Sequence, residues 1–199
     1  MSRKHRNRKS ESKKHETKKS EHKGNKSKKN DNKEKKTSYN AWQRFQTFKL
    51  RGEWVELIFM AAAALYGFRV LKLWGDSHEY DVAIEYRGGF LRVQVKSASR
   101  RKGGGYLCRL RRGGSGEQSY NPNEVDLFAI YVLPAQAWYL IPTPFIFHPT
   151  PKKNLTFYPD GLPPRSGRHD NEHNYEPYRE AWGLLRKSRS ELNRRGHQR

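Results

Sequence analysis

Three polar side chains in two neighbouring apolar runs have the types and the spacing of a site for a metal ion and a phosphate. Asp81 opens the first run, and Gln94 and Lys96 lie two residues apart in the second. Residues two apart leave the same face of a β-strand, and the Arg-Gly-Gly turn at 87–89 predicts that the two runs form a hairpin. The hairpin would bring an acid, an amide and an ammonium group together at one strand end. Because burying a lone charge is costly, we expect such a cluster to bind a divalent metal and a phosphate, which would offset its charges.

The elements around this hairpin predict a mixed α/β (α+β) domain. Residues 51–67 are rich in Ala, Leu, Met and Glu and end in glycine, which predicts a helix. Apolar residues surround most of this helix after Leu57, so we expect it to be well buried. Apolar runs predict strands at 68–74, 81–86, 90–97, 106–110, 125–132 and 138–142, and a last helix at 178–192. A helix, several strands and a helix indicate a small central sheet flanked by helices.

Charge divides the chain into segments. The protein has 199 residues and a formal net charge of +21, and its first segment has no apolar side chain between Met1 and Tyr39. Such a segment cannot bury enough surface to fold, so we expect a disordered Lys/Arg-rich tail at 1–40, either a non-specific anchor on nucleic acid or a solubility tail. The other expected segments are a folded domain at 41–148, a Pro/Gly-rich loop at 149–175 and a C-terminal helix with a basic end at 176–199.

Several classes of protein do not fit this sequence. Cys108 is the only cysteine, so neither an intramolecular disulfide nor a cysteine-based zinc site can form. No stretch approaches the roughly 20 apolar residues of a transmembrane helix, and no apolar segment near Met1 suggests a secretory signal. We therefore expect no membrane partner and a cytoplasmic protein associated with the bacterial nucleoid, with a nuclear or an organellar location as the alternative.

The order of the polar residues carries a family resemblance. Glu56 lies on the first helix, and Asp81, Gln94 and Lys96 follow on the two strands of the hairpin. This pattern resembles the PD-(D/E)XK nuclease superfamily, and most closely its group I intron-associated, homing-type endonucleases, which use Gln-x-Lys. The matching stretches are 51–56, 67–68, 74–77, 80–81, 92–97, 125–131 and 138–142. The resemblance implies a restriction-endonuclease-like core, a small mixed sheet with flanking helices.

The resemblance also implies an Mg²⁺-dependent endonuclease that hydrolyses phosphodiester bonds of DNA, with Mn²⁺ as a substitute ion. Asp81 would be the principal metal ligand, with the backbone carbonyl of Val95 and the carboxylate of Glu56 beside it, because Mg²⁺ prefers oxygen ligands. Gln94 would offer its amide oxygen, a weaker ligand than the acid that is commoner in the superfamily. Lys96 would orient or help deprotonate the attacking water and stabilise the charge that grows on the phosphate.

Two assignments stay open. The acid of the helix is either Glu56 or Glu53. The resemblance selects Glu56, which also begins the apolar run, whereas the helix dipole favours an acid in the first turn, such as Glu53, whatever the function. Asp126 opens an apolar strand, and for this residue we favour a fold-stabilising hydrogen-bonding role over a role in the site.

Basic residues that follow Lys96 form the predicted DNA-binding surface. Arginine makes bidentate contacts to phosphate or guanine, and neighbouring glycines allow such loops to bend into a groove. Two serines flank the predicted site, and they either bind phosphate or end strands. The full predicted set is Ser77, Ser97, Arg100, Arg101, Lys102, Arg109, Arg111 and Arg112.

Two other functions compete with that of an enzyme. A nuclease-like fold could bind DNA or RNA without cutting it, with Gln94 as a sign of relaxed catalysis, and an RNA-binding accessory protein is a weaker third option. The intact set of four site residues favours the enzyme, because acids near a phosphate repel nucleic acid unless a metal is bound. The resemblance further implies a homodimer or a higher homo-oligomer, since two DNA strands need two active sites.

Overall fold

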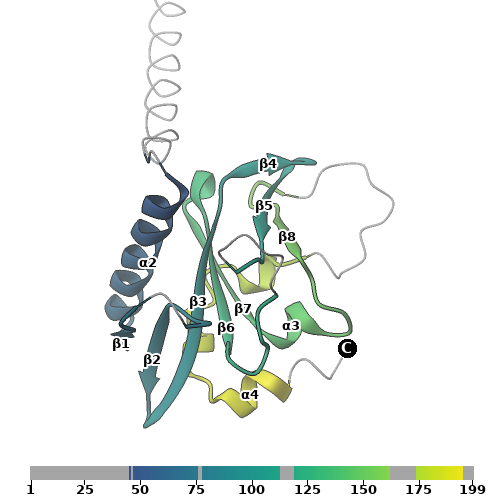
Figure 1. Ribbon diagram of the computed structural model, residues 1–199. Coiled ribbons are helices and arrows are strands. Elements are labelled where there is room, and N and C mark those ends of the chain that lie inside the picture. The colour runs from purple at the N-terminus through teal and green to yellow at the C-terminus, as the bar shows by residue number, and fades with distance from the viewer. Residues whose placement is uncertain (1–44, 46, 76–77, 113–118, 162–173, 195–199) are drawn as a thin grey trace, which may run out of the picture. The chain divides into compact units, whose positions relative to one another are not determined.

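The computed structural model describes residues 45, 47–75, 78–112, 119–161 and 174–194 (Figure 1). All of them belong to the unit that begins at Phe45. The tail expected at 1–40 and the predicted phosphate-binding Ser77 lie outside the described residues. The elements, in chain order, are α2 (Phe48–Leu65), β1 (Arg69–Lys72), β2 (Val82–Tyr86), β3 (Gly89–Ala98), β4 (Arg100–Lys102), β5 (Gly105–Arg109), β6 (Leu127–Val132), η2 (Leu133–Ala135), β7 (Ala137–Pro142), α3 (Pro144–Phe147), β8 (Asn154–Phe157), η4 (Glu176–Tyr178), η5 (Trp182–Arg186) and α4 (Arg189–Arg194).

Two sheets build the fold, and the predicted mixed class is confirmed. One has the five-stranded order β1-β2-β3-β6-β7, with β3 and β6 parallel and the other neighbours antiparallel. The other is antiparallel, with the order β4-β5-β8. Two-residue turns close the β2–β3 and β4–β5 hairpins. Both central residues of each turn have positive φ, as such tight turns require: Arg87 (51°) and Gly88 (76°), then Gly103 (58°) and Gly104 (83°).

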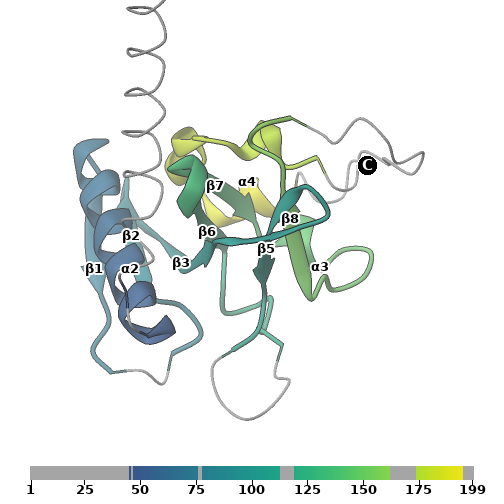
Figure 2. The same cartoon turned by 90° about the horizontal axis from the view of Figure 1, so that it is seen from above.

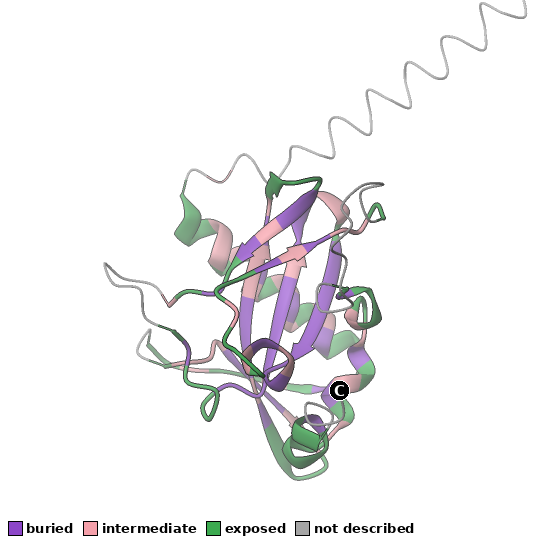
Figure 3. Ribbon diagram, turned by 90° about the vertical axis from the view of Figure 1, so that its right-hand side faces the viewer, coloured by how far each residue is buried: buried purple, intermediate pink, exposed green. Residues whose placement is uncertain are grey.

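Helix α2 lies on one side of the five-stranded sheet and the three-stranded sheet lies on the other (Figure 2). On the first side the Phe59 ring lies 5.3 Å from the Trp138 ring, and on the second the Tyr139 ring lies 4.5 Å from the Phe157 ring of β8. Strands β6 and β7 are buried almost throughout (Figure 3). The C-terminal half of β3 therefore lies between the helix and the second sheet.

Helix α2 begins at a side-chain cap, since Thr47 Oγ1 accepts from the Leu50 N–H over 3.1 Å. Its buried stripe is Val55, Phe59 and Ala63, spaced four apart. The expectation of a well-buried helix is wrong, because Leu57 and Leu65 are 60% and 89% exposed. The helix contacts the sheet on one side only, so its other apolar residues face outward. Among the described helices, none is long and apolar enough to cross a membrane.

Two segments differ from their expected structure. The segment expected as a loop at 149–175 contains β8, where Leu155 and Phe157 alternate with Asn154 and Thr156, so that only the two apolar residues are buried. The Arg/Lys/Gly stretch after β3, also expected as a loop, forms β4. Both strands are short and lie among Pro, Gly and Lys, which masks their alternation.

The helix expected at 178–192 is broken into η4, η5 and α4. Glu180 interrupts it with a φ of 49°, and the reason is a tertiary contact. The Glu180 carboxylate accepts from the Trp138 backbone N–H over 2.7 Å and from Trp182 Nε1 over 2.8 Å. Docking against the edge of β7 thus overrides the helical pattern.

Candidate active site

The site lies where β2 and β3 separate. Their pairing ends at Val82 and Val93, but β3 continues to Ala98 beside β6. Asp81, directly before β2, occupies the vacated edge. Its backbone N–H donates to the Val93 carbonyl oxygen over 3.1 Å, and its Oδ2 accepts from the Val95 N–H over 2.8 Å. The strand geometry therefore fixes the Asp81 carboxylate against the middle of β3.

Gln94 is the second residue that holds this carboxylate. Its side chain is buried, and its Nε2 donates to Asp81 Oδ2 over 2.6 Å and to the Val95 carbonyl oxygen over 3.4 Å. Both hydrogen bonds to the carboxylate thus reach Oδ2, and no described residue donates to Oδ1. The metal-ligand role of Gln94 requires its amide oxygen, whereas its nitrogen is turned toward Asp81 here. That role stays a prediction.

Lys96 leaves the same face of β3 as Gln94, and the register with β6 turns both toward the three-stranded sheet. Its Nζ donates to the Arg111 carbonyl oxygen over 3.2 Å and lies 5.0 Å from the centroid of the Tyr120 ring. The Tyr120 hydroxyl donates to the same carbonyl over 3.3 Å. Burial lowers the pKa of Lys96, and the charge of Asp81 opposes this change. A lysine with a lowered pKa can exchange a proton near neutral pH more readily than an exposed one.

Glu56 reaches the site from α2. Its side chain is 20% exposed and forms an ion pair with Lys72 Nζ of β1. Its negative charge helps to raise the pKa of Asp81 and opposes the lowering of the pKa of Lys96, whereas Glu53 is exposed on the same helix. Of the two candidate acids, the structure thus brings Glu56 toward Asp81. Its catalytic role stays a prediction.

The electrostatics single out Asp81. Burial, followed by the negative charge of Glu56, raises the pKa of the Asp81 carboxyl to about 6. The Val95 N–H, Lys96 and Lys72 act in the opposite direction without cancelling the shift. A buried acid beside a second acid, with its pKa raised, is the kind of group found at functional sites, where a bound cation would offset its charge.

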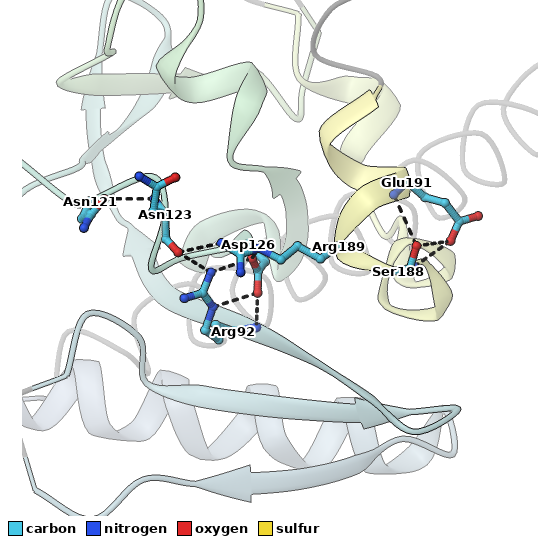
Figure 4. A network of polar contacts seen from close by, with 7 residues as sticks. All are labelled: Arg92, Asn121, Asn123, Asp126, Ser188, Arg189 and Glu191. Atoms are coloured by element: carbon cyan, nitrogen blue, oxygen red, sulfur yellow. Dashed lines mark hydrogen bonds and ion pairs between the residues drawn. The ribbon is translucent and has the colours of Figure 1, made fainter.

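Asp126 belongs to a different cluster (Figure 4). Its Oδ2 accepts from the Arg92 backbone N–H at 2.9 Å and from Arg92 Nε at 3.0 Å, and its Oδ1 lies 2.9 Å from both Arg92 Nη2 and Arg189 Nε. Arg92 and Arg189 also donate to the Asn123 carbonyl oxygen. This network ties the start of β6 to β3 and α4, as expected of a fold-stabilising residue.

The predicted DNA-binding residues lie mainly on the three-stranded sheet. Arg100, Arg101 and Lys102 form the exposed strand β4. Arg109 and Arg111 are exposed at the end of β5, while Ser97 lies half-buried in β3. Arg112 forms an ion pair with Glu79, so its charge is partly neutralised within the protein. Their role in binding stays a prediction.

The donor set of the site fits a hard divalent cation. Asp81 and Glu56 supply carboxylates, and the negative charge of Glu56 helps to raise the pKa of the Asp81 carboxyl. The Val95 carbonyl oxygen accepts a long hydrogen bond from Gln94 and lies beyond the last β2–β3 pair, so it can serve as a further oxygen ligand. No group of three or more His, Cys, Asp or Glu side chains that could hold a metal occurs among the described residues. The fit therefore rests on two acids, an amide and a backbone carbonyl.

Sequence patterns did not reveal the residues that support this set. Lys72 pairs with Glu56, and Tyr120 and the Arg111 carbonyl hold Lys96. These contacts join segments far apart in the chain, and no local spacing marks them. Asn154 and Thr156 of β8 were also missed, although their alternation with buried Leu155 and Phe157 is a visible strand signal.

Comparison with known proteins gives matching results. The sequence profile of the family described as PD-(D/E)XK endonuclease matches residues 46–154, a range that includes all four predicted catalytic residues. Among solved structures, the chain is similar to the bacterial homing endonuclease I-Ssp6803I, with 26% sequence identity and a TM-score of 0.58, over 70% of this chain and 93% of that chain. No curated protein matches the chain.

Proposed function

Because the chain belongs to the PD-(D/E)XK endonuclease family, we propose that it is an Mg²⁺-dependent endonuclease that hydrolyses phosphodiester bonds of duplex DNA. One observation carries the proposal. The Asp81 carboxylate is held on a single oxygen by Gln94 and the Val95 N–H, while burial and Glu56 raise its pKa to about 6. A fold tolerates such a group where a bound cation offsets its charge in the working state.

Four groups would hold the metal: the carboxylates of Asp81 and Glu56, the Val95 carbonyl and the Gln94 side chain. A bound Mg²⁺ lowers the pKa of its water and neutralises charge on the phosphate. Two hydrogen bonds from β3 hold the Asp81 carboxylate in this position. Lys72 holds the Glu56 carboxylate on the side of β1.

Lys96 would act on the attacking water and on the phosphate. Its ammonium group is held by the Arg111 carbonyl and the Tyr120 ring, which fix the direction of Nζ. Its lowered pKa makes the neutral amine accessible, so Lys96 can take a proton from water and return to the charged form. As a cation it then stabilises the additional negative charge of the transition state.

DNA as the substrate is supported by the distribution of charge. The chain carries a formal net charge of +21, and exposed Arg100, Arg101, Lys102 and Arg109 line the strands beyond the site. Arginine and lysine at this density attract a polyanion and release its counterions. The likeness to a homing endonuclease further supports a preferred duplex target over random cutting.

The direct test is cleavage of a library of duplex DNA fragments that carry random sequence. Wild-type protein with Mg²⁺, or with Mn²⁺, should produce new ends with 5′-phosphate and 3′-hydroxyl groups at a preferred sequence, and Asp81→Asn should produce none. Glu53→Gln serves as the matched acid control, because Glu53 is exposed on α2. If wild-type protein retards the DNA in a gel but leaves it intact with both ions, the chain is a nucleic-acid-binding protein and the proposal is wrong.

A further inference from the structure

A recess lies outside the active site, on the three-stranded sheet β4-β5-β8. Its volume is about 620 Å³, and it opens between the hairpin tip of β4–β5 and strand β8. Six of its lining residues carry the argument: Lys102, Arg109, Arg111, Asn154, Thr156 and Tyr158. We call it the sheet groove.

Strand register explains why these side chains share one face. Arg109 pairs with Asn154, and Leu107 pairs with Thr156. Directly paired residues of antiparallel strands lie on the same side of a sheet, and every second residue follows them. The residues in between, such as Cys108 and Leu155, are buried in the core. The face of the sheet that carries Arg109, Asn154 and Thr156 is therefore the outer face.

Four of the polar side chains that line the sheet groove form no polar contact with other described residues. No hydrogen bond or ion pair of the described residues involves the side chains of Lys102, Arg109, Asn154 or Thr156. The lining includes three cations and no acid. Such a surface suits a polyanion that also offers hydrogen-bonding edges between its charges.

Strands β5 and β8 pack so closely at Gly105 that a larger residue would not fit there. A Cβ at residue 105 would lie 2.7 Å from the Phe157 carbonyl oxygen and from atoms of Thr156 and Tyr158. The close approach at Gly105 holds β8 against β5 and sets the spacing of the side chains on the outer face. Arg109, Asn154 and Thr156 thus lie on paired strands rather than on a loop.

We propose that the β5–β8 ribbon enters the major groove of duplex DNA, where Asn154 and Thr156 read base edges. This inference rests on the proposed function and names how its target is selected. The ribbon is two-stranded only toward Arg109 and Asn154, because β4 pairs with β5 at residues 105–107. A two-stranded ribbon fits the major groove, an asparagine amide can pair with adenine, and the threonine methyl group can contact thymine. Lys102 at the hairpin tip and Arg109 at the strand end would hold phosphates. The major groove of A-form RNA is too narrow for such a ribbon.

Arg111 connects the sheet groove with the active site. Its side chain lines the groove, while its backbone carbonyl accepts hydrogen bonds from Lys96 Nζ at 3.2 Å and from the Tyr120 hydroxyl at 3.3 Å. DNA bound at the sheet groove would therefore contact Arg111, the residue whose carbonyl positions Lys96. Arg111 would thus take part both in binding the target DNA and in placing the ammonium group of Lys96.

The test is selection of binding sites from a random duplex library by full-length protein carrying Asp81→Asn, without divalent metal. In this background sequence recognition is measured without DNA cleavage, so a failed cleavage assay does not decide whether the inference is right. Adding Asn154→Ala should erase the base preference at one or two adjacent positions, by about tenfold or more against the wrong base, with an unchanged salt slope. Adding Asn154→Asp should shift that preference toward cytosine, because an acid accepts from the cytosine amine.

Cation variants provide the contrast. Arg109→Ala should weaken binding to all sequences alike and reduce the slope of log affinity against log salt by about one. Arg69→Ala, on the edge strand of the other sheet, should leave both affinity and preference unchanged. Thermal unfolding of each variant confirms that it folds. A selected motif that survives in the Asn154→Ala/Thr156→Ala double variant overturns the inference. It is also overturned if the Asp81→Asn protein with intact Asn154 and Thr156 selects no motif.

Discussion

Asp81 and Asp126 have similar places in the chain and different surroundings. Each stands directly before a strand of the five-stranded sheet, and each accepts a backbone N–H of β3 on its Oδ2. Asp126 also receives the guanidinium groups of Arg92 and Arg189, which reach both of its oxygens. Asp81 receives only neutral N–H groups, on one oxygen, and its close charged neighbours include the carboxylate of Glu56.

This difference separates a structural acid from a candidate catalytic one. When the protein itself neutralises a buried acid, breaking the pair lowers stability, and the acid has little capacity for a ligand. A buried acid that keeps its charge beside another acid makes the folded state less stable. A bound cation would offset this cost. The same residue type at the same kind of position thus serves two purposes, and the surroundings decide which.

The largest expected effect is the loss of cleavage in Asp81→Asn. Asparagine keeps the shape and can still accept from Gln94 and the Val95 N–H, but it removes the charge that would bind the metal. We expect the cleavage rate to fall about a thousandfold or more, and DNA binding to persist. Initial rates on the preferred duplex measure this. A rate within tenfold of wild type would remove Asp81 from the site.

The reverse pattern is expected for Asp126→Ala. The substitution leaves Arg92 without its bidentate partner and cuts the link to Arg189, so the free energy of unfolding should fall by about 3 kcal/mol. Denaturant unfolding measures it, with Arg189→Ala as the milder control, because Arg189 is half exposed. Folded Asp126→Ala should cleave DNA within a few-fold of the wild-type rate. A selective loss of cleavage would make Asp126 part of the active site.

Lys96→Ala should reduce the cleavage rate about a hundredfold, in the range of a lost general base, while the affinity for metal and DNA persists. Tyr120→Phe is the matched control. It removes the hydroxyl that donates to the Arg111 carbonyl but keeps the ring under Lys96 Nζ, so a loss of only a few-fold is expected. Equal losses in both variants would assign the effect to packing around Arg111 instead of to the ammonium group.

The raised pKa of Asp81 predicts the direction in which the stability of the protein changes with pH. The folded protein holds this proton up to a pH of about 6, whereas the unfolded chain releases it near pH 4. The folded state therefore binds more protons between these values, and its stability from this group falls as pH rises through the window. Above it, metal-free Asp81→Asn should be more stable than wild type by on the order of 2 kcal/mol. Thermal unfolding across pH measures the difference, and a less stable variant would contradict the charge argument.

The smallest contrast concerns the two acids of α2. Glu56→Gln should lower metal-dependent cleavage about tenfold, since one carboxylate of the proposed ligand set is lost. Glu53→Gln should stay within twofold of wild type, because its side chain is exposed. Rates measured across a range of Mg²⁺ concentrations distinguish weaker metal binding from slower chemistry. A reversed pair of results would move the second acid from Glu56 to Glu53.

Local patterns in the sequence predict most of the central sheet. The alternation and the Arg-Gly-Gly turn predict β2 and β3, and the strand register then turns Gln94 and Lys96 to one face. Apolar runs predict β6 and β7 because these strands are buried on both sides. Local patterns cannot predict which residue forms an ion pair with a given charged side chain. The arginines around Asp126 come from β3 and the C-terminal helix, and only the fold brings them together.

The second sheet illustrates the other limit. Strands β4 and β8 are three and four residues long and lie among Gly, Lys and Pro, so composition favours loops there. Their pairing with β5 supplies the hydrogen bonds and the buried side chains that propensity alone does not. The predicted basic residues of this region consequently form a groove on a sheet rather than a set of bending loops.

Metal binding tests the central claim most directly, because it needs no knowledge of the target sequence. Titration calorimetry with Mn²⁺ would compare the full-length wild type with Asp81→Asn and with Asp126→Asn, at a pH above the Asp81 pKa of about 6. We expect wild type and Asp126→Asn to bind the ion, the affinity of wild type to fall as the pH drops below that value, and Asp81→Asn to bind none at this site. Equal binding by wild type and Asp81→Asn would contradict the account.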